Sequence, residues 1–335
     1  MTIRHISRRG AIQFLGAAGL AAMTPLEALL AQTSAQGGMT FLGIGDWGRG
    51  GRNHQSDVAH QMARVADRLN PRFILSVGDN FYENGVTSIT DPAWQHSFER
   101  VYDAPSLQGP WRVTLGNHDY HGNVQAQIDY SAHSKRWHLP SHWYDFSERA
   151  PDGTTAQFFV LDTSPMIERY YEDGARAVKV GDQRAKVPVQ LAWLDRGLAA
   201  STADWKIVIG HHPVYTGKAE GGYRAKASAE HRHGGNPELI DMIDPLIRKH
   251  GVALYLNGHD HDLQHVIHGD THYVCTGAGS LTDTHCYIGD SDFCSLQSGF
   301  VTCNLNRHRL SVTYVDYRGR HLHVVDIPPV HSSVV

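Results

Sequence analysis

Five segments of the chain present Asp, Asn or His at the end of an apolar run. They are GDWG at Asp46, GDNFY at Asp79, GNHD at Asn117 and His118, GHHP at His211, and GHDH at His259 and His261. Carboxylate, amide and imidazole groups suit Zn, Fe or Mn, whereas calcium rarely recruits so many histidines. A set this rich in donors predicts a site for two cations. A carboxylate such as Asp79 is suited to bridge them at the roughly 3.5–4 Å separation of two-metal hydrolytic sites.

Each motif taken alone has a simpler interpretation. Asp and His directly after a strand are commonly helix caps or loop residues. The coincidence of five motifs favours a shared site. Tyr82, in GDNFY, is by residue type alone more typical of a core aromatic.

The elements that must position these residues are predicted from hydrophobic patterns. The runs MTFLGIGD, FILSVGD, WRVTLGNHD, QFFVLDTS, WKIVIGHHP and VALYLNGHDH are predicted strands. Helices are predicted at 54–69, around VQLAWLDRGLAA, and at NPELIDMIDPLIRKH with a possible break at Pro245. In open α/β sheets the ligand crevice lies outside the carboxyl ends of the strands, so the five segments are expected to converge.

The last part of the chain has a different pattern. THYVCTG, GFVTCNL, RLSVTYVDY and HLHVVDI are predicted short strands separated by turns. The alternation favours a mostly parallel first sheet with flanking helices, joined to a more antiparallel C-terminal sheet in one domain.

The five blocks, in this order, resemble those of the calcineurin-like metallophosphoesterases. GDNFY, with its Tyr82, is similar to the purple acid phosphatases, and residues 116–140 together with GHDHDLQ resemble the small tartrate-resistant type. The resemblance implies an α/β fold, a four-layer sandwich of two mixed β-sheets flanked by helices, as a single domain over residues 38–330.

The resemblance also implies a binuclear centre of Fe(III) and a divalent metal, which is Fe, Zn or Mn. The implied ligands are Asp46, Tyr82 and His261 for Fe(III), Asn117, His211 and His259 for the divalent ion, and Asp79 as the bridge. The division is chemically reasonable because a hard trivalent ion favours carboxylate and phenolate, while imidazoles suit the softer divalent ion.

The implied reaction is hydrolysis of small phosphate monoesters by a metal-activated hydroxide, with an acidic optimum. His118 is expected to protonate the leaving alcohol. Asp119 is expected to hold His118 or a ligand imidazole through its remaining ring N–H. Glu220 lies about where the family has an acidic or histidine residue, but its role and that of His212 stay open.

Three other functions compete with this one. A phosphodiesterase or broad-range metallophosphoesterase would use two divalent metals, and Tyr82 would then be a packing residue and not a metal ligand. An exported binding protein would capture phosphate without turnover. GIGDWG, residues 43–48, fits the glycine spacing of dinucleotide-binding loops, but no suitably placed acidic residue follows a second strand. A net charge of −4 with mixed signs disfavours a nucleic-acid partner.

Residues 1–35 are predicted to be a twin-arginine-type export signal. Arg8 and Arg9 precede an Ala- and Gly-rich run that is too short and too weakly apolar to span a membrane. Such a signal implies passage through the twin-arginine export machinery, a periplasmic or secreted location, and no stable membrane anchor after its removal. An ordinary secretory signal with an incidental arginine pair is the alternative.

The four cysteines lie near the C-terminus and include no C-x-x-C pair. This spacing favours disulfides in an oxidising compartment over a zinc site. Of the three possible pairings within Cys275, Cys286, Cys294 and Cys303, we favour Cys286 with Cys294, against the alternative that all four are free.

Overall fold

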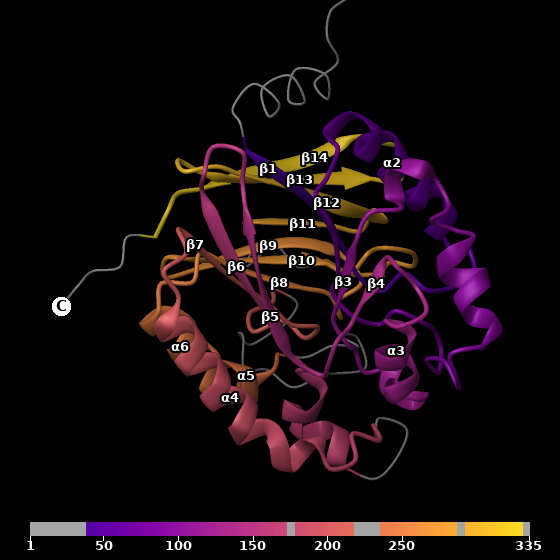
Figure 1. Cartoon of the computed structure of the whole chain (residues 1–335), viewed down its shortest axis with the longest axis horizontal. Coiled ribbons are helices and arrows are strands. Elements are labelled where there is room, and N and C mark those ends of the chain that lie inside the picture. Colours follow the sequence, from indigo (N-terminus) through magenta and orange to yellow (C-terminus); the bar gives the residue numbers. More distant parts are fainter. Residues whose placement is uncertain (1–37, 173–177, 218–234, 287–291, 331–335) are drawn as a thin grey trace, which may run out of the picture.

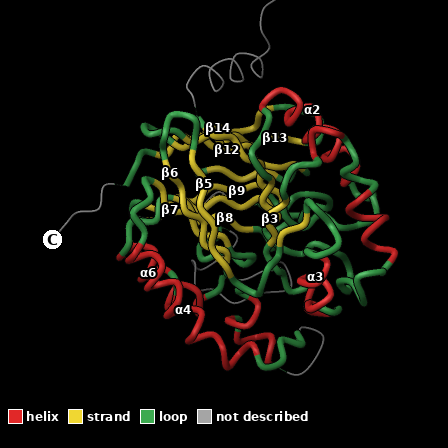
Figure 2. The backbone as a smooth tube through the Cα atoms, viewed as in Figure 1, coloured by secondary structure: helices red, strands yellow, loops and turns green. Residues whose placement is uncertain are grey.

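The computed structural model of the chain describes residues 38–172, 178–217, 235–286 and 292–330. Two seven-stranded sheets stack on each other, with helices outside them (Figures 1 and 2). Aromatic side chains pack between the sheets: the ring of Phe41, in the first sheet, lies 5.4 Å from that of Phe158 in the second. The predicted sandwich of two mixed sheets flanked by helices is confirmed.

The first sheet joins strands from both ends of the chain. Its order is β14 (His321–Ile327), β13 (Leu310–Asp316), β12 (Gly299–Leu305), β1 (Met39–Ile44), β2 (Ile74–Ser76), β3 (Trp111–Val113) and β4 (Trp137–His138). The strands from β1 to β4 run parallel, and β12 pairs antiparallel with β1.

The second sheet is also mixed. Its order is β11 (Phe293–Ser295), β9 (Leu263–His268), β10 (Thr271–Thr276), β8 (Leu254–Asn257), β7 (Trp205–Ile209), β6 (Thr155–Val160) and β5 (Tyr144–Arg149). The strands β6, β7, β8 and β10 are parallel, whereas β5, β9 and β11 are antiparallel to their neighbours.

The expected division into a parallel first sheet and an antiparallel C-terminal sheet is therefore wrong. The parallel strands are shared between both sheets, and the C-terminal strands extend each of them. The physical reason is that hydrophobic alternation specifies which face of a strand is buried, but not which neighbour it pairs with.

The helices cover the outer faces. In Figure 1, α2 (Gln55–Leu69) and α3 (Val124–Tyr130) lie on one side, and α4 (Gln183–Ala200), α5 (Pro237–Met242) and α6 (Asp244–Lys249) on the other. The break predicted at Pro245 is confirmed, because α5 ends at Met242 and Pro245 lies in the first turn of α6. A proline is tolerated there, since that turn has no intrahelical partner for its N–H.

The disulfide between Cys286 and Cys294 is confirmed, while Cys275 and Cys303 are buried and lie outside this disulfide. The predicted export signal lies outside the described residues and stays a prediction. Within the part of the chain that the structure describes, no helix has the length and apolar character needed to cross a membrane.

Candidate metal centre

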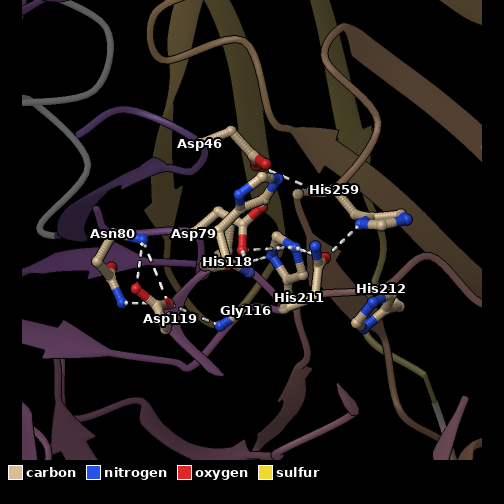
Figure 3. Close-up of polar contacts among 12 residues, drawn as sticks. Asp46, Asp79, Asn80, Gly116, His118, Asp119, His211, His212 and His259 are labelled. Carbon is tan, nitrogen blue, oxygen red and sulfur yellow. Dashed lines mark hydrogen bonds and ion pairs between the residues drawn. The ribbon is translucent and has the colours of Figure 1, made fainter. Parts of the chain in front are cut away.

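The predicted ligands lie in loops that leave the carboxyl ends of five strands. In the first sheet Ile44, Ser76 and Val113 are aligned at the ends of β1, β2 and β3. In the second sheet β7 and β8 are parallel neighbours and end beside each other. The loops after these five strands therefore meet at one edge of the sandwich, as Figure 3 shows for six of the side chains they carry: Asp46, Asp79, His118, Asp119, His211 and His259.

The hydroxyl of Tyr82 lies at the centre of the first group of ligands. It donates to Asp46 Oδ1 at 2.8 Å or Asp79 Oδ2 at 3.0 Å, and it lies 2.9 Å from His261 Nε2. These are the residues that the sequence predicts around Fe(III). One ion at their centre would reach an oxygen or nitrogen of each.

The amide oxygen of Asn117 lies at the centre of the second group. It is 3.2 Å from His211 Nε2 and 3.0 Å from His259 Nδ1. Asp79 belongs to both groups, because its Oδ1 is 3.4 Å from His211 Nε2 while its Oδ2 faces Tyr82. The structure thus brings all seven predicted ligands together, with Asp79 between the two groups.

Three of the ligand-bearing residues have left-handed backbone conformations. The φ angles are 59° at Asp46, 49° at Asp79 and 70° at His259. Residues other than glycine adopt this region only a few per cent of the time, and such strain concentrates at functional sites. It indicates that the loops are held in shapes that turn these side chains inward.

Two glycines allow the loops to approach each other. A Cβ atom on Gly116 would lie 2.2 Å from Asp79 Oδ1, and one on Gly258 would lie 2.3 Å from Asp46 Oδ2. Each glycine therefore makes room for a carboxylate carried by a different strand end. This explains the G-N-H-D and G-H-D-H spacing in terms of close backbone approach.

The buried charges shift the acid–base behaviour of the site. Burial alone would raise the pKa of Asp79, but the charges of His211 and His118 outweigh it and hold that pKa well below its usual range. Burial lowers the pKa of His211, and the carboxylates of Asp79 and Asp46 more than reverse this, to about 9. Burial, Asp46 and Asp79 together raise the pKa of the Tyr82 hydroxyl well above its usual value.

The donor set fits a pair of cations. Two carboxylates, a phenol, an amide and three imidazoles face one another, and ligand atoms of Asp46, Asp79 and His211 all lie within 4.8 Å of one another. None of the seven is a lysine or arginine that would neutralise the carboxylates. Bound cations would supply that charge and would match the oxygen and nitrogen donors.

His118 lies at the mouth of the site with 26 % of its side chain exposed. Its Nδ1 is 2.7 Å from the backbone oxygen of Glu83, so this nitrogen carries the proton and donates it. The other nitrogen, Nε2, faces the cluster and is 4.0 Å from Asp79 Oδ2. This orientation suits the predicted role as a proton donor.

Asp119 has different partners from those expected. Its buried carboxylate accepts hydrogen bonds from the backbone N–H groups of Gly116 and Asn80 and from the side chains of Asn80 and Gln127, not from His118 or a ligand imidazole (Figure 3). Burial, and then the charge of Asp79, raise the pKa of Asp119 to about 7. Asp119 therefore ties together the two loops that carry Asp79 and Asn117.

His212 is buried beside the site, and its ring centre is 4.3 Å from that of His259. Its two nitrogens lie 2.8 Å from Thr163 Oγ1 and 2.7 Å from the Tyr170 hydroxyl. These contacts indicate a supporting role. Glu220 lies outside the described residues.

Two residues at the site were not predicted from the sequence. Arg169 is half-buried, with Nη2 3.3 Å from His259 Nε2. Asp283 forms two hydrogen bonds with the backbone of His261. Its Oδ2 accepts from the His261 N–H at 3.2 Å, and its own backbone N–H donates to the His261 oxygen at 2.9 Å. Neither lies in one of the five motifs: Arg169 lies in a short 3-10 helix, Glu168–Tyr171, and Asp283 lies in the segment that follows β10.

The segment GIGDWG, residues 43–48, does not form a nucleotide-binding loop. No helix begins directly after it, since α2 starts at Gln55 and His54 makes no capping side-chain hydrogen bond. A Cβ on Gly48 would lie 1.8 Å from the oxygen of Asn80, so this glycine permits contact between two ligand loops.

Comparison with known proteins gives consistent results. The model of the calcineurin-like phosphoesterase family matches residues 39–263. Purple acid phosphatase 4 of Arabidopsis thaliana is 35% identical over 322 residues, which cover 92% of this chain and 90% of that protein. Tartrate-resistant acid phosphatase type 5 of Homo sapiens is 34% identical over 332 residues, covering 92% of this chain and 97% of that protein.

Solved structures show the same fold. GAP50, described as the anchor in the inner membrane complex of Plasmodium, matches with a TM-score of 0.71 at 22% identity, over 88% of this chain and 90% of that one. Purple acid phosphatase PPD1 from yellow lupin matches with a TM-score of 0.58 at 15% identity, over 88% of this chain and 54% of that one. With its sequence relatives and its converging donor set, this chain belongs to the calcineurin-like phosphoesterase family and, within it, to the purple acid phosphatases, which are phosphoric monoester hydrolases.

Proposed function

We propose that this chain is an exported acid phosphatase that hydrolyses small phosphate monoesters with Fe(III) and a divalent ion, either Fe, Zn or Mn. The observation that carries the proposal is the position of the Tyr82 hydroxyl, between the carboxylates of Asp46 and Asp79 and the ring of His261. A phenolate and two carboxylates are the hard anionic donors that a trivalent ion favours.

Residues Asp46, Tyr82 and His261 would hold Fe(III), and Asn117, His211 and His259 the divalent ion, with Asp79 shared. When bound, the two cations supply Lewis acidity, which makes water nucleophilic at low pH and offsets charge on the phosphoryl oxygens.

The protein supplies proton transfer and orientation. Nδ1 of His118 donates to Glu83, so the proton passed to the leaving oxygen is the one that Nε2 carries when the ring is in its imidazolium form, and the ring is left neutral with its proton on Nδ1. Arg169 is the cation at the divalent-ion side, and among the described residues it forms no ion pair with a carboxylate. We assign it to a phosphoryl oxygen of the substrate, for which a guanidinium is well suited.

The colour of the iron-loaded protein tests the metal assignment. A phenolate bound to Fe(III) gives a visible charge-transfer band, so the wild type should be coloured and Tyr82→Phe should lose the band. Tyr170→Phe is the control, because the Tyr170 hydroxyl contacts His212 instead of the ligand group. A colourless iron-loaded wild type would reject Tyr82 as a ligand and favour a phosphodiesterase with two divalent metals.

Turnover separates the enzyme from a phosphate-capturing protein. The metal-loaded protein should release phosphate from p-nitrophenyl phosphate with an acidic optimum. Binding of phosphate without any such release would support capture alone.

Export belongs to the same proposal and is supported by Arg8 and Arg9 ahead of the apolar run. Replacement of both by lysine should retain the precursor in the cytoplasm, as measured by cell fractionation. Normal export of this variant would favour an ordinary secretory signal.

A further inference from the structure

The guanidinium of Arg49 lies over the ring of Tyr82. Arg49 belongs to the loop that follows Asp46, its side chain is only 8% exposed, and its Cζ lies 3.5 Å from the centre of the Tyr82 ring. A guanidinium in this position is attracted to the negative face of the aromatic ring, and burial strengthens the attraction.

The guanidinium is fixed in place from several directions. Its Nη1 donates to Glu83 Oε1 at 2.7 Å, and its Nε donates to Ser280 Oγ at 3.1 Å. Ser280 in turn donates to the backbone oxygen of Asp46 at 2.6 Å. Arg49 therefore connects the loop of Tyr82 with the loop of Asp46, and both loops carry predicted ligands of the same ion.

The positive charge of Arg49 acts on the Tyr82 ring more strongly than the negative charge of its partner Glu83 does. The side chain of Glu83 is 66% exposed, so water screens its carboxylate, whereas Arg49 is buried against the ring. The ring of His118 also lies beside Tyr82, with a centre-to-centre distance of 4.4 Å. The Tyr82 ring thus contacts two side chains, of which Arg49 carries a permanent charge.

We propose that Arg49 is a positioning residue that holds the Tyr82 ring and stabilises its phenolate form electrostatically, and so sets the electronic energy of the ligand to Fe(III). This inference rests on the proposed function, because it takes Tyr82 as an iron ligand. It assigns a role to a residue outside the predicted ligand set.

The direction of the effect follows from the position of the charge. The guanidinium lies against the ring, whereas Fe(III) would be held by the phenol oxygen. The charge therefore stabilises the phenolate electrons more than it stabilises the acceptor level of the iron. Removing it should lower the energy of the charge-transfer transition and shift the absorption band to longer wavelength. It should also move the Fe(III)/Fe(II) potential to a more negative value, because a positive charge near iron favours the reduced state.

The test compares Arg49→Met and Arg49→Lys with the wild type, all iron-loaded and with metal content measured. Arg49→Met should show the band at longer wavelength and a more negative potential. Arg49→Lys keeps the charge but not the planar group that stacks, and should shift less in the same direction. Arg52→Met is the matched control: Arg52 lies in the same loop but is exposed, bonds to the backbone oxygen of Arg49, and should leave the band unmoved.

The outcomes separate this inference from the proposed function. A colourless wild type rejects Tyr82 as the iron ligand and removes the basis of both. A coloured wild type whose band and potential stay the same in Arg49→Met rejects only the role of Arg49. If Arg49→Met does not fold, Arg49→Lys decides alone: an unmoved band overturns the inference and a shift to longer wavelength supports it.

Discussion

The backbone N–H of His259 donates a hydrogen bond to Asp46 Oδ2 at 3.0 Å, although 213 residues separate the two positions. Asp46 follows a strand of the first sheet and His259 follows a strand of the second. The bond therefore joins the two sheets at the metal site. A change that separates these loops should affect the ligands of both ions together.

Gly258→Ala tests this connection. The added Cβ would lie 2.3 Å from Asp46 Oδ2, and we expect a loss of about 1–3 kcal/mol in the free energy of unfolding. We also expect cation affinity to fall roughly 10–100-fold, as when a ligand loses its support. Denaturant unfolding and competition with a chelator measure the two effects. Gly109→Ala is the control, since nothing lies within 4 Å of its added Cβ, and equal behaviour of the two variants would contradict the prediction.

His118→Gln tests proton donation to the leaving group. We expect kcat to fall by roughly 10²–10⁴-fold for alkyl phosphates, the usual contribution of general acid catalysis. The loss should be much smaller for p-nitrophenyl phosphate, because p-nitrophenolate needs little protonation to leave. His121→Gln is the control, because His121 is exposed in the same loop, with its ring centre 5.6 Å from that of His118. Equal losses for both substrates would exclude acid catalysis by His118.

Asp119→Asn tests the link between the loops of Asp79 and Asn117. An amide presents only one acceptor to the four donors that now surround the carboxylate, so we expect a loss of about 1–3 kcal/mol in the free energy of unfolding. Cation affinity should fall with it, while the fully loaded variant keeps the pH profile of the wild type. Asp129→Asn, an exposed change on α3, should alter neither quantity. A pH profile that changes would give Asp119 a direct role in proton transfer.

Arg169→Gln tests the assigned phosphate contact. Loss of a charge-assisted hydrogen bond should weaken inhibition by inorganic phosphate by about tenfold or more. Metal content should stay unchanged. Arg184→Gln serves as control, because Arg184 is exposed and pairs with Glu168 at 2.8 Å. If Arg169→Gln loses metal but binds phosphate normally once reloaded, Arg169 supports His259 instead.

Cation binding should release protons. Before cations bind, the pKa of His211 is about 9 and that of Tyr82 is higher still, so both carry a proton at pH 7. Both must lose it to act as ligands, and we expect release of about two protons and an affinity that rises with pH. Calorimetric titration of the chelator-treated protein in buffers of different ionisation enthalpy measures this number. Tyr82→Phe should release one proton fewer than the wild type. If the two proteins release the same number of protons, the assignment of Tyr82 as a ligand is contradicted.

The same pKa shift has a consequence for stability. Because the pKa of His211 is raised in the fold, its protonation stabilises the cation-free protein. This contribution is complete below about pH 6.5, the ordinary pKa of histidine. This contribution is lost as pH rises towards about 9. Chemical unfolding of the chelator-treated protein should therefore show a decline between these values. A free energy of unfolding that rises between these two pH values would contradict this prediction.

The sequence indicates which donors converge because most of them lie at or just after the end of an apolar run, whereas Tyr82 is implied only by the family resemblance. The position at a strand end is a local property, and parallel strands bring such positions to one edge. Sheet membership is different. The residues of β12 alternate as any strand does, and only the completed fold shows that Gly299–Leu305 pairs with β1.

The strand β5 and the residues around the ligands show the same limit. The sequence YDFSER of β5 has charged and polar side chains, which is typical of an edge strand. It lacks the apolar run by which the other strands were predicted. Asp119 meets Gln127 and Asn80 only through tertiary packing. Arg49, in a glycine-rich loop, has the sequence context of a solvated surface residue, and its burial on Tyr82 depends on residues far along the chain.

The pairing of β1 with β12 also has a consequence for the time at which the centre can form. The strand that leads to Asp46 has β2 on one side and Gly299–Leu305 on the other. During synthesis, β1 emerges from the ribosome long before its second neighbour exists. A nascent chain therefore cannot complete this part of the site before residues 299–305 have been synthesised, so we expect cations to bind only after that point.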